Sequence, residues 1–150
     1  MKKNIFRIVL LFVLTLPFLA FADEARAEEC LSYEPVKVRL IGTIVEKTFP
    51  GPPEFESIEK GDRPEAHWIL KLIRPVCVNG DPKSELNVET EKKVNAVQLI
   101  IYGDEGRYKH FLSRKVIATG TLFHAHTGHH YTKVLMEVIS IRLGKDENKK

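Results

Sequence analysis

The sequence feature that most constrains the fold is a period-two alternation of apolar and polar residues in short segments. It is clearest where Val36, Val38 and Leu40 alternate with Lys37 and Arg39. Such alternation is typical of a β-strand with one buried face. Strand patterns recur along the chain, whereas only one short segment has helical spacing. The sequence therefore predicts a mainly β fold.

The strand patterns are rich in β-branched and aromatic residues and are bounded by turn-forming residues. The predicted strands are Val36–Val45, Trp68–Ile73, Val94–Tyr102, Lys115–Phe123 and Thr132–Ile141. We expect the first strand to bend at Gly42, because apolar residues stop alternating there. We expect the second to end before Pro75, which has no N–H to donate to a ladder. Trp68 is predicted to lie in the core.

A single helical pattern follows the third predicted strand. Tyr108, Phe111 and Leu112 recur at i, i+3 and i+4 after Asp104, a residue type that caps helices. Five strands with one short helix between the third and fourth is the element order of the OB-fold. The sequence thus predicts a small five-stranded OB-like barrel, and a small open sandwich remains the alternative.

The first 22 residues have the pattern of a secretory signal peptide. The cations Lys2, Lys3 and Arg7 precede an apolar stretch that ends in the small-x-small triplet Ala20–Ala22. A second possible cleavage site follows Ala27. The apolar stretch is shorter than the ~20 residues of a membrane-spanning helix. We expect cleavage, no membrane span afterwards, and a periplasmic or secreted protein.

The mature chain is predicted to be electrically neutral. The leader holds three of the 23 Lys and Arg and none of the 20 Asp and Glu, so 20 charges of each sign remain over residues 23–150. Binding to nucleic acid or to an anionic membrane surface needs clustered cations. Neither partner is expected. We predict a single domain over residues 30–143 and a disordered polar tail over residues 144–150.

Two cysteines remain after export, and they predict one disulfide. Cys30 and Cys77 form an even pair in a small exported domain. A reactive thiol would need cationic neighbours, but Cys30 follows two glutamates and Cys77 lies between two valines. Closing so long a loop stabilises a fold by about 4 kcal/mol in the chain-entropy model.

The loop after the first predicted strand is rich in proline and acidic residues. Residues 49–65 hold four prolines and five acids, and prolines reduce the entropy that a loop loses on binding. We consider this loop a recognition edge; alternatively, its apolar residues plug one end of the barrel. The candidate ligand-binding residues are Phe49, Pro52, Glu54, Phe55, Glu56 and Asp62, with Tyr131 from the turn described next.

The turn before the fifth predicted strand is rich in histidine. Residues 123–131 contain His124, His126, His129 and His130. Strand parity places the first two on one face, and a tight turn brings one of the others beside them. Three imidazoles suit zinc, or copper or nickel in an oxidising compartment, and zinc or copper is the candidate cofactor. The alternative is that these histidines hydrogen-bond to Thr127, Thr132 or the backbone and order the turn.

The two loops are expected to lie near each other. In an OB-fold, the loop between the first two strands and the loop between the last two flank the binding face. If the predicted topology is right, Glu54, Glu56 and Asp62 approach the histidine turn.

Several runs of residues resemble a known family. They are Phe49–Ile58, with its Phe-Pro-Gly-Pro-Pro start, Gly61–Asp62, Arg74–Val78, and Gly120–His130, with its His-x-His-Thr-Gly-His-His turn. Together they resemble a bacterial family of small exported domains of unknown function, over roughly residues 30 to 141. The family's turn often has a third consecutive histidine where this chain has Tyr131. The resemblance implies one exported domain and no particular reaction.

Three functions follow from these features. The favoured one is an exported binding or inhibitory module that holds a peptide, a glycan or an envelope protein on its two loops. The second is a histidine-based metal-binding protein or a metal-dependent hydrolase. The third is a structural envelope module that acts through an exposed strand edge. The sequence has no glycine-rich phosphate loop, G-x-S-x-G, H-E-x-x-H or C-x-x-C motif, so catalysis is not the favoured interpretation.

Overall fold

The computed structural model describes residues 29–144. The expected signal peptide and the tail beyond Gly144 lie outside the described residues. The strands are β1 (Leu31–Ser32), β2 (Lys37–Pro50), β3 (Pro64–Asn79), β4 (Glu91–Ile100), β5 (Lys115–His124) and β6 (Val134–Leu143). Two 3-10 helices are present, η1 (Ile58–Lys60) between β2 and β3 and η2 (Glu105–Phe111) between β4 and β5. The prediction of a mainly β fold is confirmed.

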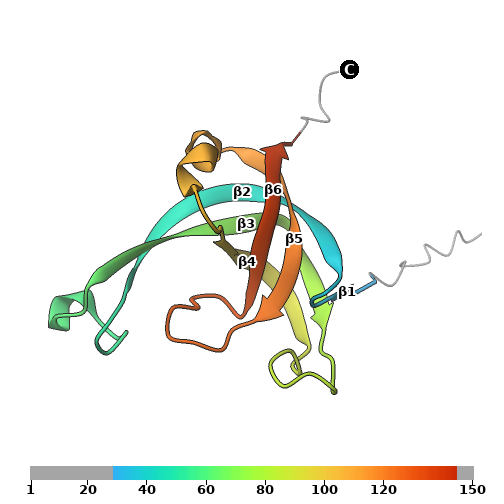
Figure 1. Cartoon of the computed structure of the whole chain (residues 1–150), viewed down its shortest axis with the longest axis horizontal. Coiled ribbons are helices and arrows are strands. Elements are labelled where there is room, and N and C mark those ends of the chain that lie inside the picture. Colours follow the sequence, from blue (N-terminus) through green and yellow to red (C-terminus); the bar gives the residue numbers. More distant parts are fainter. Residues whose placement is uncertain (1–28, 145–150) are drawn as a thin grey trace, which may run out of the picture.

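Five of the strands form a closed ring of hydrogen-bonded pairs. β2 pairs with β3 and β5, β6 pairs with β5 and β4, and β4 returns to β3. All these pairs are antiparallel except β4–β6. β1 lies outside the ring and pairs in parallel with the end of β3. Figure 1 shows the long β2–β3 hairpin projecting to one side, with η1 near its tip.

β2 changes partner at Gly42. It pairs with β5 from Lys37 to Thr43 and with β3 from Gly42 to Pro50. A Cβ atom on Gly42 would lie 2.3 Å from the carbonyl oxygen of Lys71. The absence of a side chain therefore lets the main chains of β2 and β3 approach closely where β2 leaves one neighbour for the other.

The buried faces of the ring strands form one apolar core. The alternation in β2 buries Val38, Leu40 and Ile44, and β3 contributes Trp68 and Leu70. The expected core position of Trp68 is confirmed. One polar side chain, that of Gln98 in β4, is also fully buried, and it bears on the site described below.

The second predicted strand is longer than the sequence indicated. β3 passes through Pro75 and ends at Asn79, so the expected end at Ile73 is wrong. The β3–β4 register is irregular between Lys71 and Val76. Pro75 lies within this interruption, where its missing N–H breaks no regular ladder. The predicted strands also missed β1, which has only two residues.

The predicted short helix is a seven-residue 3-10 helix, η2. Asp104 precedes it, as expected, but the Asp104 side chain makes no capping hydrogen bond. Phe111 is its buried residue. The buried Phe111 side chain therefore anchors one end of this segment, and the α-helical face expected from the spacing of Phe111 and Leu112 does not form.

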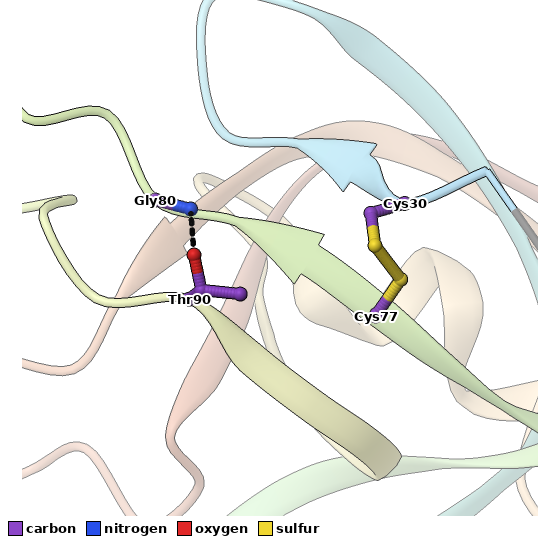
Figure 2. The surroundings of a disulfide bond; sticks show 4 residues. All are labelled: Cys30, Cys77, Gly80 and Thr90. Carbon is purple, nitrogen blue, oxygen red and sulfur yellow. Dashed lines mark hydrogen bonds between the residues drawn. A yellow bond between two sulfur atoms is a disulfide. The ribbon is translucent and has the colours of Figure 1, made fainter.

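The predicted disulfide between Cys30 and Cys77 is confirmed. It joins the residue before β1 to β3, with the two Cα atoms 4.7 Å apart (Figure 2). Near it, the N–H of Gly80 donates a hydrogen bond to Thr90 Oγ1, 2.9 Å away, which closes the base of the β3–β4 loop (Figure 2). The bridge fastens β1 to the sheet.

Candidate functional site

The β2–β3 loop (residues 51–63) and the β5–β6 loop (residues 125–133) meet, and we call their joint surface the loop face. The Phe55 ring meets the His129 ring edge-on, with centroids 4.8 Å apart. The Tyr131 ring stacks on Phe49 at 4.2 Å and 8°. Gly128 lies so close to Phe55 that an added Cβ would be 3.3 Å from its ring. These contacts bring together segments that are more than 70 residues apart.

The carboxylate of Glu65 is the polar link between the two loops. Its Oε2 atom accepts a hydrogen bond from His129 Nδ1 at 2.8 Å and contacts Tyr131 Oη at 3.4 Å and His67 Nε2 at 3.5 Å. The hydrogen bond from His129, supported by His67, holds the pKa of Glu65 below its ordinary value although partial burial opposes this. An ionised carboxylate therefore anchors the β5–β6 loop.

Gln98 fixes the orientation of this cluster from inside the core. Its Oε1 accepts the Tyr131 N–H at 2.7 Å, and its Nε2 donates to the His129 carbonyl at 2.9 Å. The same Nε2 lies 3.3 Å from His67 Nδ1. Because an amide nitrogen is only a donor, this Nδ1 accepts, and the His67 proton resides on Nε2, facing Glu65. We call Glu65, His67, Gln98, His129 and Tyr131 the Glu65 cluster.

Asp62 organises the β2–β3 loop. Its two carboxylate oxygens accept the N–H groups of Glu54, Glu56 and Ser57 at 2.7–2.8 Å. The hydrogen bonds from Ser57, Glu54 and Glu56 lower the pKa of Asp62, although its burial opposes this. Asp62 was expected among ligand-binding residues near the histidine turn, but its carboxylate faces its own loop.

The remaining predicted loop residues lie on the outer surface of the loop face. Glu54 and Glu56 are exposed, and Pro52 and Phe55 are half-buried. Within residues 29–144, the Glu54 and Glu56 carboxylates make no hydrogen bond or ion pair. Glu54 and Glu56 flank Phe55, whose ring contacts His129, but the acid whose carboxylate bonds to His129 is Glu65.

His124 belongs to a second group of polar residues beneath the turn. Its Nε2 lies 3.2 Å from Glu91 Oε1, and Lys133 Nζ lies 3.1 Å from Glu91 Oε2. Burial alone would raise the pKa of Glu91, but the hydrogen bonds from His124 and Lys133 lower it overall. The His124 N–H also donates to Asn87 Oδ1 at 2.8 Å. His124 thus ties the end of β5 to β4 and the β3–β4 loop.

His126 and His130 form a pair of their own. The His126 N–H donates to His130 Nδ1 at 3.0 Å, and the two rings meet edge-on at 4.6 Å. Both rings also contact Phe123. Burial, with the nearby His126 and His129, lowers the pKa of His130. A His130 ring that is neutral can accept this hydrogen bond and close the turn.

The structure does not bring three imidazoles of the turn together. His124 points to Glu91, His129 points to Glu65, and His126 pairs with His130. In the described part of the chain, no group of three or more His, Cys, Asp or Glu residues is placed to hold a metal ion. The alternative expectation named Thr127, Thr132 and the backbone as partners of these histidines. The backbone is such a partner for His124, His126 and His130, whereas the side-chain partners are Glu65 and Glu91.

Sequence reasoning missed three members of the Glu65 cluster: Glu65, His67 and Gln98. Gln98 lies in a predicted strand, His67 directly precedes one, and Glu65 was only one of five acids in its loop. The available signal was Gln98 itself, the one polar residue in the run Ala96–Ile101. A buried amide must satisfy its donors and acceptor, so such a residue marks polar partners nearby.

Comparison with known proteins gives one match. Residues 96–142 match the model of a domain of unknown function, DUF4431. The DUF4431 match runs from β4 to β6 and includes Gln98 and the whole histidine turn, but not the β2–β3 loop. No curated protein and no solved structure matches the chain. Within residues 29–144, no helix is long and apolar enough to cross a membrane.

Proposed function

We propose that this protein is an exported binding module whose loop face recognises a cationic segment of another envelope protein. The observation that carries the proposal is the locking of the two loops by the Glu65 cluster. Phe55 contacts His129, and Tyr131 stacks on Phe49, so acids and rings from distant segments share one surface. A surface that is ordered before binding loses less entropy when its partner arrives.

The strand pairings support a binding role for this surface. The ring β3–β2–β5–β6–β4–β3 is the pairing expected of a five-stranded Greek-key barrel of the OB type. In such barrels, the loops joining the first two and the last two strands flank the ligand. If the ring is such a barrel, these loops correspond to residues 51–63 and 125–133, which form the loop face.

Three exposed acids of the loop face favour a cationic ligand, and two exposed cations, Lys60 and Arg63, lie in the same loop. Glu54, Glu56 and Glu59 are exposed and have no ion pair within the described residues. Phe55 lies among them and presents an aromatic ring, to which Lys and Arg side chains are also attracted. Complementary charge directs a partner to such a surface and sets its orientation.

The order of the β2–β3 loop is built into its sequence. Asp62 accepts hydrogen bonds from three main-chain N–H groups on the opposite side of the loop. The loop also contains prolines, which limit its conformations before binding. Glu54 and Glu56 are therefore held in place through their own backbone N–H groups.

Export fits two features of the chain. The first 22 residues have the pattern of a secretory leader. The Cys30–Cys77 disulfide is compatible with an oxidising compartment outside the cytoplasm. We therefore place the module in the periplasm or outside the cell.

The test is site-specific photo-crosslinking in the cells that produce the protein. A photoreactive phenylalanine analogue replaces Phe55 on the loop face or, as a control, Tyr102, which is 68% exposed and follows β4. We expect a discrete adduct from position 55 and none from position 102. The adduct should disappear when Glu54→Lys and Glu56→Lys are added, because both changes reverse the charge of the surface.

A matched control keeps this test specific. Glu85→Lys and Glu89→Lys reverse two exposed acids in the β3–β4 loop and should leave the adduct unchanged. The proposal fails if position 55 gives no adduct, or if the adduct survives reversal of Glu54 and Glu56.

A further inference from the structure

A groove opens between β2 and β3 beyond Gly42. The ladder of these strands ends at the pair Gly42–Leu72, because β2 turns away to pair with β5. β3 continues, pairs with β4 on one side, and meets β1 at Val78. The groove between the separated strands has a volume of about 170 Å³, and we call it the strand slot.

Strand main chain borders the slot on both sides. Ile44 exchanges hydrogen bonds with residues 113 and 114 on the β5 side of β2. Because successive residues of a strand face opposite edges, Arg39 and Ile41 direct their main-chain groups toward the slot. No register pair joins residues 37–41 to β3 in the described chain. Within the described residues, this part of β2 therefore has no strand partner on the slot side and can accept an added strand.

The floor and walls of the slot are apolar. Leu40, Leu72 and Val76 line it, together with Ile41 and Ile73 at its rim. Ile41 is 39% exposed and Ile73 is 55% exposed. These two isoleucines lie on neighbouring strands and form an apolar surface, and the exposure of such a surface to water is unfavourable.

The charges at the slot have one sign. Arg39 and Arg74 are the charged residues in its lining, and both are exposed. Within residues 29–144, neither guanidinium has an ion pair. The occupant that complements this surface has apolar side chains for the floor and carboxylates for the two arginines.

We propose that the strand slot docks an extended segment of a partner protein in which apolar residues alternate with Asp or Glu. The segment adds as a strand to the edge of β2 at Arg39 and Ile41. Successive side chains of an added strand point to opposite faces, so its apolar side chains cover Leu40, Leu72 and Val76 on the floor of the slot. Its carboxylates then face outward beside Arg39, with Arg74 also in the lining. Phe49 is eight positions along β2 from Ile41, about 26 Å along a strand, so this surface is distinct from the loop face and independent of its role.

Peptide-display selection against the disulfide-bonded protein tests the proposal. A library of random ten-residue peptides is selected on the wild-type protein, and enriched sequences are measured against variants by fluorescence anisotropy. We expect enrichment of alternating apolar and acidic residues. Arg39→Glu with Arg74→Glu should weaken their binding about tenfold or more, whereas Arg142→Glu, an exposed control on β6, should not.

A change in the peptide separates strand addition from charge attraction alone. Methylation of alternate main-chain nitrogens leaves the peptide's charges intact and removes donors that an added strand needs, so binding should be lost for one of the two alternating patterns. This measurement requires no change to the protein.

Three results would overturn the proposal. The first is enrichment of peptides without alternating acids. The second is equal binding to the wild type and to the Arg39→Glu, Arg74→Glu variant. The third is binding of the wild type to phosphatidylglycerol vesicles, lost in that variant, with no peptide enriched; a membrane surface would then be the ligand.

Discussion

Gln98 and His67 lie side by side on β4 and β3, with Gln98 Nε2 3.3 Å from His67 Nδ1. The same amide group binds both main-chain ends of the His129–Tyr131 segment. One buried side chain therefore sets the tautomer of His67 and the position of the turn that carries half of the loop face.

Replacing Gln98 should destabilise the protein and loosen the turn. Gln98→Leu keeps a similar volume but leaves the Tyr131 N–H and the His129 carbonyl without their partner. We expect a loss of about 2 kcal/mol in the free energy of unfolding, the usual cost of stranded buried polar groups. Chemical denaturation measures it, and Asn95→Ala, at an exposed position of β4, is the control. Unchanged stability in Gln98→Leu would show that the amide does not hold the turn.

The Glu65 anchor should make stability depend on pH on the acid side. The pKa of Glu65 is lower in the folded protein than its ordinary value of 4.5. Its contribution is therefore complete above the unfolded pKa and disappears as the pH falls through the folded value. The stability difference between the wild type and Glu65→Gln should be constant from about pH 7 to pH 5.5 and shrink below about pH 4.5. A difference that grows on acidification would contradict this assignment.

Tyr33 should produce the opposite dependence on the alkaline side. Its side chain is buried, and its hydroxyl has no hydrogen-bond partner among the described residues. Burial, with Glu91 and Glu89 nearby, raises the pKa of Tyr33 from 10.0 to about 12. The neutral hydroxyl favours the folded state, and this contribution disappears as the pH rises from 10.0 to about 12.

The corresponding variant is Tyr33→Phe. It should be as stable as the wild type or more stable at neutral pH, because it removes an unsatisfied buried hydroxyl. Between pH 10.0 and about 12, the stability of this variant should also decline less than that of the wild type. Denaturation at several pH values measures both effects, and a marked destabilisation by Tyr33→Phe at neutral pH would reveal a hydrogen bond to the hydroxyl.

Gly42 should be intolerant of substitution. A Cβ atom there would lie 2.3 Å from the Lys71 carbonyl oxygen, which belongs to the main chain of β3 and has little room to move. We expect Gly42→Ala to cost about 2 kcal/mol or more, as overpacking does elsewhere. In Gly106→Ala, the control, the nearest atom is the end of the Asp104 side chain, which can rotate away. Equal thermal stability of the two variants would contradict the close approach.

The sequence predicted the parts of the fold that depend on local pattern. The alternation of side chains located all five ring strands, because the two faces of each strand meet different surroundings. β1 and the passage of β3 through Pro75 escaped prediction. Both depend on partners distant in the chain, namely the Val78 pairing of β1 and the irregular register of β3 with β4.

The same distinction applies to the candidate site. The two loops were identified from their composition, which is local. The cluster that joins them depends on strand register, since the pair Ile69–Gln98 brings Gln98 near His67. The convergence of three histidines was inferred from strand parity and a tight turn. Neither accounts for Glu65 and Glu91, the acids that bind His129 and His124.

The most direct test of the loop face as a recognition surface is titration calorimetry with two matched panels of short peptides. One panel contains Lys and Arg with aromatic residues, and the other contains Asp and Glu in their place. We predict binding of the cationic panel alone, weakened by salt and abolished by Glu54→Lys with Glu56→Lys. No binding of the cationic panel at low salt, or binding that the double variant retains, would contradict the account.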